Sequence, residues 1–352
     1  LNTPMPKIQI ANMKEEYINK TNYSIFSSLL FDNINQALNN HKQVILFKNQ
    51  RGYASNIRCE VCGWVAKCPN CDVYLTYHKH LQTLNCHYCG LNLPLYSECP
   101  ECHSHSLIQS GNGSEKIEEE TLRFFPNARV KRMDLDTTRK KNDYLEIIQD
   151  FEKGNIDILC GTQIITKGLD FSNVGLVGVI DADSLLYYPD FRAYERCFDL
   201  LTQVAGRAGR LKEKGRVVIQ SFNPNHQIFN EVLNYDYASM YKNQIVERKL
   251  FSYPPFVYLT KILFQSKDKD VLDTLCQEYS NEIRKIFGQR ILGPEYPPIY
   301  RIKGMYQKQF ILKLEKNVSY TQAKKLIMQL NEEILSKREY KQTRVIVDVD
   351  PF

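Results

Sequence analysis

Eight of the eleven cysteines in this 352-residue chain fall in four Cys-x-x-Cys pairs within one short segment. The pairs are Cys59/Cys62, Cys68/Cys71, Cys86/Cys89 and Cys99/Cys102. A Cys-x-x-Cys turn presents two thiolates to one side, and two such turns supply the four tetrahedral ligands of a zinc ion. Four pairs therefore predict two closed zinc sites, which are structural because no position is left open for water or substrate.

The gaps between the pairs favour a nested arrangement. The long middle gap suits a two-stranded ribbon that brings Cys68, Cys71, Cys86 and Cys89 to one ion. Cys59, Cys62, Cys99 and Cys102 then meet at the base of the segment. The spacing alone leaves other pairings open. Gly63 and Gly90 directly follow second cysteines, where such a turn often needs a positive φ.

Other chemistry is less consistent with this segment. Redox activity would need one exposed pair at a helix N-terminus rather than four clustered pairs. The nearby histidines are predicted to be surface or DNA-facing residues, because eight thiolates already saturate two ions; they are His78, His80, His87, His103 and His105. Cys160, Cys197 and Cys276 stand alone among apolar residues and are predicted to be packed core thiols.

A second string of residues suits phosphoryl transfer. The sequence from Gln203 to Arg210 reads Q-V-A-G-R-A-G-R, and Arg207 and Arg210 share one face of a helix. A planar, permanently charged guanidinium is what a transferring γ-phosphoryl group requires. A merely solvated basic helix would not need the helix-weakening glycines between these arginines.

Apolar periodicity predicts alternating helices and strands around these motifs. We expect helices at 24–41, 115–125, 144–153 and 195–207, and strands at 44–47, 130–133, 156–160, 176–180 and 216–222. This alternation predicts an α/β fold with a parallel sheet covered on both faces, interrupted by the cysteine segment.

A further helical stretch runs to about residue 250, and a smaller α+β unit follows it. Its expected elements are a strand at 258–265, a helix at 269–287, strands near 291 and 309–314, a helix at 321–337 and a strand at 344–349. The order β-α-β-β-α-β predicts a split βαβ sandwich.

Composition sets weak limits on function. Lys and Arg exceed Asp and Glu by 46 − 40 = 6, a mild basic excess that permits a nucleic-acid partner without requiring one. No apolar stretch approaches the ~20 residues of a membrane span. The opening Leu1-Asn2-Thr3-Pro4 is neither a Met start nor a secretory signal. We therefore expect a cytoplasmic chain that is a piece of something longer.

The string Q-x-x-G-R-x-G-R resembles the last motif of superfamily 2 helicases, and the string from Gly161 to Phe171, G-T-Q-I-I-T-K-G-L-D-F, resembles their fifth. With the eight-cysteine insertion and the terminal Asp348-Val349-Asp350-Pro351, the chain resembles the primosomal replication-restart helicases from about Pro6 to Phe352.

This resemblance implies a RecA-like helicase lobe and specific residue roles. Arg207 and Arg210 would act as the arginine finger. Gln203, Gly168 and Asp170 would line the nucleotide cleft, and Thr162 and Lys167 would contact phosphates of the tracking DNA strand. The family implies ATP- and Mg²⁺-dependent 3′-to-5′ unwinding at abandoned forks, and reloading of the replicative helicase. It also implies contact with single-strand-binding protein and primosome components by a monomer.

The chain also departs from a complete helicase. It contains no G-x-x-x-x-G-K-[ST] phosphate loop, so the chain alone should be inactive. Asp181 and Asp183 resemble magnesium ligands, but we predict that they cap a strand or order the next loop. The expected domains are a linker at 1–23, lobe two at 24–57 and 105–250, the zinc insertion at 58–104, and a C-terminal DNA- or partner-binding domain at 251–352.

Basic and aromatic residues interleave in the C-terminal domain: Arg301, Lys303, Lys308 and Lys313 alternate with Tyr300, Tyr306 and Phe310. This pattern suits phosphate contact with base stacking. It equally suits an edge strand guarded by lysines. The family resemblance favours contact with branched or single-stranded DNA, with Arg301 and Lys303 as contacts. The alternative for the whole chain is a non-catalytic, zinc-stabilised scaffold that binds DNA or proteins.

Overall fold

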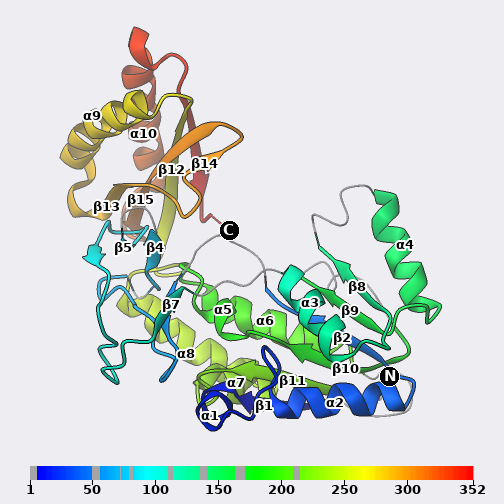
Figure 1. Cartoon of the computed structure of the whole chain (residues 1–352). Helices are drawn as coiled ribbons and strands as arrows, with labels where there is room; N and C mark the ends of the chain where they lie inside the picture. Colours follow the sequence, from blue (N-terminus) through cyan, green and yellow to red (C-terminus); the bar gives the residue numbers. More distant parts are fainter. Residues whose placement is uncertain are drawn as a thin grey trace.

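The computed structural model describes residues 6–49, 56–71, 73–78, 82–109, 114–134, 141–162, 171–208 and 215–351. The chain forms a parallel-sheet lobe, a cysteine-rich module at one end of it, and a C-terminal domain that stands beside the module (Figure 1). No helix in the described residues is long and apolar enough to cross a membrane.

The lobe is built on a six-stranded parallel sheet, as the alternation predicts. Its strands lie in the order β1 (Lys7–Asn12), β11 (Arg216–Ser221), β10 (Val174–Val179), β2 (Gln43–Phe47), β9 (Ile158–Gly161) and β8 (Val130–Met133). All five residues of β2 are buried, because a central parallel strand is covered on both faces.

Helices cover both faces of this sheet. Val44 and Leu46 of β2 pack with α2 (Ser28–Asn39) and α3 (Ser114–Phe124) on one face. Ile45 and Phe47 pack on the other face with α4 (Lys141–Glu152), α6 (Ala193–Ala205) and α7 (Gln227–Leu233). The alternation of side chains along one strand thus divides the core between two helical layers.

The linker prediction for residues 1–23 is wrong where the structure describes them. Residues Lys7–Asn12 form β1, which pairs in parallel with β11, and Met13–Asn19 form α1. Ile8 and Ile10 pack against the lobe core. The segment has only two alternating apolar residues, and its pairing partner lies far along the chain, so local periodicity does not reveal the strand.

The remaining lobe helices also differ from expectation in detail. The stretch expected to be helical to residue 250 is two helices, α7 and α8 (Tyr237–Leu250), because Tyr235 between them adopts a positive φ of 51°. The helix expected from residue 24 begins at Ser28, where Ser27 accepts a hydrogen bond from the Leu30 amide. A short helix, α5 (Asp183–Leu186), precedes α6.

The cysteine-rich module is inserted between β2 and α3. Strands β3 (Ile57–Cys59) and β7 (Leu107–Gln109) pair at its base, and β4 (Thr76–His78), β5 (Thr83–Asn85) and β6 (Asn92–Pro94) form a three-stranded sheet. Its core consists of a few aliphatic and aromatic residues together with Cys68, Cys71, Cys86 and Cys89. So small a core needs metal binding for stability.

The C-terminal domain is the predicted split βαβ sandwich. Its elements are β12 (Val257–Ser266), α9 (Lys269–Phe287), β13 (Ile291–Glu295), β14 (Arg301–Ile302), β15 (Met305–Glu315), α10 (Tyr320–Leu335) and β16 (Arg344–Val349). The sheet order is β13-β15-β12-β16, and every neighbouring pair is antiparallel. β15 therefore lies between β12 and β13, which are joined through α9.

Candidate zinc module and motor surface

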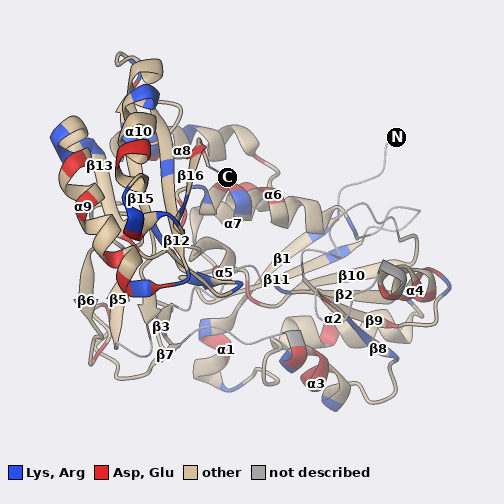
Figure 2. Cartoon of the chain, turned by 90° about the horizontal axis from the view of Figure 1, so that it is seen from above, with Lys and Arg blue, Asp and Glu red and all other residues tan. Residues whose placement is uncertain are grey.

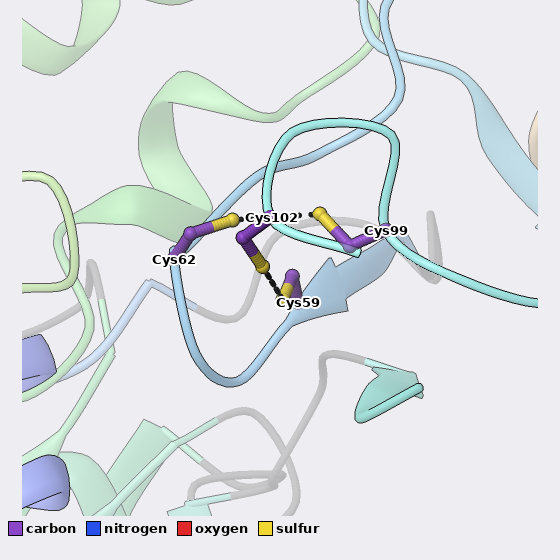
Figure 3. A group of neighbouring side chains, drawn as sticks. All are labelled: Cys59, Cys62, Cys99 and Cys102. Carbon is purple, nitrogen blue, oxygen red and sulfur yellow. Dashed lines mark hydrogen bonds between the residues drawn. The ribbon is translucent and has the colours of Figure 1, made fainter. Parts of the chain in front are cut away.

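Two groups of four cysteines each bring their sulfur atoms within 4.8 Å of one another. The outer group is Cys59, Cys62, Cys99 and Cys102, whose side chains converge in Figure 3. The inner group is Cys68, Cys71, Cys86 and Cys89. The nested pairing is confirmed.

The sulfur spacing tests whether these groups fit zinc. The Sγ atoms of Cys59 and Cys102 lie 3.6 Å apart, and those of Cys68 and Cys89 also lie 3.6 Å apart. A tetrahedral ion with Zn–S bonds of about 2.3 Å has sulfur–sulfur edges of about 3.8 Å, whereas a disulfide requires about 2 Å. The thiolates therefore hold two structural zinc ions, one in each group.

The turns that carry the ligands share one backbone pattern. The amide of Gly63 donates to the Cys59 carbonyl at 3.0 Å, and the amide of Gly90 donates to the Cys86 carbonyl at 3.0 Å. Gly63 and Gly90 have φ of 78° and 81°, as predicted. His103 takes the same place after Cys102 with φ of 58°, so glycine favours this conformation but is not required.

The outer zinc site packs on the lobe at the carboxyl ends of β10 and β11. The Arg58 guanidinium lies 3.9 Å from the centroid of the Phe222 ring. The Tyr187 hydroxyl is 3.5 Å from the Gly63 carbonyl. A Cβ on Gly63 would lie 3.2 Å from the Cβ of Phe222, so glycine also permits this close approach.

The histidines near the cysteines behave differently from one another. His103 and His105 are exposed, as predicted, and His80 lies outside the described residues. The prediction is wrong for His87, which is 3% exposed. The burial of His87 lowers its pKa to about 4, and its hydrogen bond with the Tyr296 carbonyl opposes this shift. The pKa of His78 is also lowered by burial.

The three lone cysteines are core thiols, as predicted. Cys160, Cys197 and Cys276 are each 0% exposed. Burial raises the pKa of Cys160 and of Cys276 to about 12, so these thiols stay protonated and unreactive.

The motor motif begins on α6, which ends at Ala205. Gln203 is exposed, and Arg207 is half-buried just beyond the helix. α6 leads from the carboxyl end of β10 back to the start of β11, whereas Thr162 directly follows β9 at the carboxyl edge and is buried. Arg210, Gly168, Asp170 and Lys167 lie outside the described residues, so the finger pair and the nucleotide cleft stay predictions.

Asp181 and Asp183 order the segment after β10, as predicted. Asp183 is 1% exposed and accepts hydrogen bonds from the Ser221 hydroxyl and the Phe222 amide, each at 2.8 Å. Its burial raises its pKa to about 6. Asp181 accepts from the Ser184 amide at 3.3 Å. Both carboxylates therefore have structural partners in the lobe.

Sequence reasoning missed Lys48, which follows β2 at the carboxyl edge. The chain leaves β2 toward β8 and leaves β10 toward β11, so these neighbouring strands flank the crevice where parallel sheets bind ligands. Lys48 is 6% exposed, and its ammonium has no ion pair or hydrogen bond with any residue that the structure describes. Burial lowers the pKa of Lys48, and the negative charge of the nearby Asp181 carboxylate opposes this shift.

Arg58 adds a second, partly buried cation to this crevice. Its guanidinium lies 3.9 Å from the Asp181 carboxylate, and it also contributes to the lowered pKa of Lys48. Lys48 and Arg58 are cations that could contact an anionic group such as a phosphate at this edge, beside the Asp181 and Asp183 carboxylates. The sequence signal was a lysine directly after the apolar run 44–47, but its importance depends on the topology.

The predicted basic and aromatic group of the C-terminal domain divides in two. Arg301 and Lys303 are exposed on the β14–β15 hairpin, and the Arg301 guanidinium lies 4.7 Å from the Tyr306 ring centroid. Tyr300 is 48% exposed and stacks beside Tyr306. Phe310, by contrast, is buried in the domain core.

Lys308 and Lys313 have partners within the protein. Lys308 pairs with Asp273 at 2.7 Å, and Lys313 donates to the Phe251 carbonyl at 2.8 Å. Acidic and basic residues also alternate on α9 and α10 (Figure 2). The free basic and aromatic surface is therefore the β14–β15 hairpin.

Three family descriptions match separate parts of the chain. Residues 249–352 match the primosomal protein N C-terminal domain, residues 68–94 match the PriA DNA helicase Cys-rich region domain, and residues 103–212 match the helicase conserved C-terminal domain. Replication restart protein PriA of Bacillus subtilis is 39% identical over 350 residues, which are 99% of this chain and 43% of that protein. The chain belongs to the PriA family.

Other PriA proteins match this chain with similar identity and coverage. That of Borreliella burgdorferi is 36% identical over 93% of this chain and 48% of its own length. The chain thus spans about half the length of the curated PriA proteins it matches. The PriA Cys-rich region match contains all four inner ligands. Among solved structures, the Pyrococcus furiosus Hef helicase domain is 16% identical over 57% of this chain and 27% of its own, with a TM-score of 0.28, which supports no further argument.

Proposed function

We propose that this chain is part of an ATP-dependent 3′-to-5′ DNA helicase that remodels stalled replication forks and helps reload the replicative helicase. The main support is a PriA-family lobe that carries Q-x-x-G-R-x-G-R at the end of α6, continuous with the zinc module and the PriA C-terminal domain. In the full-length protein, ATP and Mg²⁺ are the cofactors. The partners are branched and single-stranded DNA, single-strand-binding protein and primosome components, bound by a cytoplasmic monomer.

In this proposal the lobe supplies the finger side of the ATPase site. Arg207 and Arg210 stabilise charge on the transferring phosphoryl group, and Gln203, Gly168 and Asp170 line the nucleotide cleft. The phosphate loop and the magnesium ligands come from another part of the protein, because this sequence has no phosphate-loop motif.

DNA contact uses two surfaces. Thr162, at the carboxyl edge of the sheet, and Lys167 contact phosphates, and Lys48 and Arg58 add positive charge to that edge. On the C-terminal domain, Arg301 and Lys303 contact phosphates while the exposed Tyr300 ring stacks on an unpaired base.

The test is an unwinding assay on the full-length protein with forked substrates of opposite polarity. We expect ATP-dependent unwinding from a 3′ single-stranded tail and DNA-stimulated ATP hydrolysis. DNA binding by the full-length protein with no ATP hydrolysis would favour the alternative, a zinc-stabilised scaffold without turnover.

A further inference from the structure

The inner zinc site lies against the C-terminal domain, whereas the outer site lies against the lobe. Strands β4 and β5 of the module are next to β13 and β15 of that domain (Figure 1). The Tyr253 hydroxyl donates a hydrogen bond of 2.8 Å to the Cys71 carbonyl. The Gln309 side-chain amide donates a hydrogen bond of 3.0 Å to the His87 carbonyl. Both ligand turns of the inner site are therefore bonded to the C-terminal domain.

The second inner turn, Cys86–Gly90, is fixed at two more points. The His87 Nδ1–H donates to the Tyr296 carbonyl at 2.5 Å, which orients the buried ring. A Cβ on Gly90 would lie 2.1 Å from the Glu295 carboxylate, so strand β13 closes directly on the turn. The conformation of this ligand turn thus depends on the C-terminal domain.

Charge complements this contact. The Lys313 ammonium lies 3.9 Å from the Tyr253 ring centroid and donates to the Phe251 carbonyl. It is half-buried and lies within electrostatic reach of the Cys71, Cys86 and Cys89 thiols. A zinc ion bound by four thiolates carries net negative charge, which a partly buried lysine stabilises. Tyr253 also stacks on Phe191 of the lobe at 4.4 Å, so the contact joins all three parts.

The outer site provides an internal comparison. Its turn at Gly63 contacts Phe222 and Tyr187 of the lobe. Among the described residues, no hydrogen bond joins either outer turn, 59–63 or 99–103, to the C-terminal domain.

We infer that the C-terminal domain completes the inner zinc site, through Tyr253, Gln309 and Lys313, so that zinc retention there and docking of the domain stabilise each other. Groups that hydrogen-bond around a metal's ligands commonly change metal affinity by about 10–100-fold. Linkage is reciprocal, so loss of the inner zinc must also weaken docking. The outer zinc is independent of this equilibrium.

Zinc release from the purified chain to a chromogenic chelator tests the first half. Tyr253→Phe removes only the hydroxyl, and Gln309→Ala removes the second hydrogen bond. Each should speed release of one zinc equivalent about 10-fold or more, with alkylation appearing first at Cys68, Cys71, Cys86 and Cys89 by mass spectrometry. Tyr320→Phe, which removes a hydroxyl elsewhere in the domain, is the control and should release zinc at the wild-type rate.

Unchanged release in both variants, or equal acceleration of both zinc equivalents, would overturn the inference. The reciprocal test compares Cys68→Ser with Cys59→Ser by hydrogen exchange of residues 291–309. Exchange should rise in the first variant alone. Protection that stays at the wild-type level after inner zinc loss would show that the domain docks without it. Neither assay depends on ATP hydrolysis.

Discussion

The sulfur atoms of Cys62 and Cys99 lie 3.5 Å apart although 37 residues separate them in the sequence. The other outer pair, Cys59 and Cys102, closes in the same way at 3.6 Å. These distances join the two ends of the inserted module at its base, where β3 and β7 pair. The outer zinc therefore fixes the module to the lobe as a closed insertion.

We predict two zinc ions per chain, each bound by four thiolates. Elemental analysis should find two equivalents in the wild-type chain and one after Cys68→Ser. Because structural zinc contributes folding free energy directly, chelation should unfold residues 58–104 and leave the α/β lobe largely intact by hydrogen exchange. One equivalent in the wild-type chain, or two in the variant, would disprove the assignment.

Two four-cysteine sites were predictable because each turn contributes two ligands locally, and the gap lengths favoured the nested pairing without excluding the others. The parallel sheet was predictable because runs such as Val44–Phe47 are apolar without interruption. Strand β1 was not, since its stability comes from pairing with β11. The burial of His87 was equally hidden, because it depends on Tyr296, 209 residues away.

Lys48→Met should raise the free energy of unfolding, because a largely buried lysine whose ammonium has no ion pair among the described residues is replaced by an apolar chain of similar length. The expected gain is at most about 1 kcal/mol by denaturant titration. The same variant should weaken DNA binding and lower its salt dependence, since one phosphate contact is lost. Lys42→Met, at the opposite edge of the sheet, is the control for binding. A destabilised Lys48→Met would mean that the ammonium has a stabilising partner.

His226 makes part of the stability pH-dependent. Its neutral Nδ1 accepts a hydrogen bond of 3.2 Å from the Ile228 amide, and burial lowers its pKa to about 4. The unfolded chain, with an ordinary pKa of about 6.5, binds more protons in this interval. Stability should therefore rise with pH from about 4 to 6.5, by no more than about 3 kcal/mol.

His226→Asn keeps a capping acceptor without this titration. Relative to the wild type, its unfolding free energy should be less sensitive to pH in that window. Parallel pH profiles for the two proteins would show that His226 does not contribute.

The chain should bind single-stranded or branched DNA weakly, with affinity falling as salt rises. Tyr300→Ala should cost about 1–3 kcal/mol of binding if the exposed ring stacks on a base. Lys285→Ala, an exposed α9 lysine paired with Glu282, is the matched control. Affinity that is the same at low and high salt would indicate a protein partner for this surface.

The most direct test of the helicase account is DNA-stimulated ATP hydrolysis by the full-length protein carrying Arg210→Ala. An arginine finger acts on charge that develops in the transition state, so turnover should fall by about 10³–10⁵ with ATP and DNA affinity nearly unchanged. Arg210→Lys should restore little, because an ammonium lacks the guanidinium's geometry. Arg196→Ala, which breaks the ion pair between this arginine of α6 and Asp190, should retain wild-type turnover. If Arg210→Ala keeps more than about a tenth of its turnover, well above the loss expected for a finger, Arg210 is a structural residue and the account is contradicted.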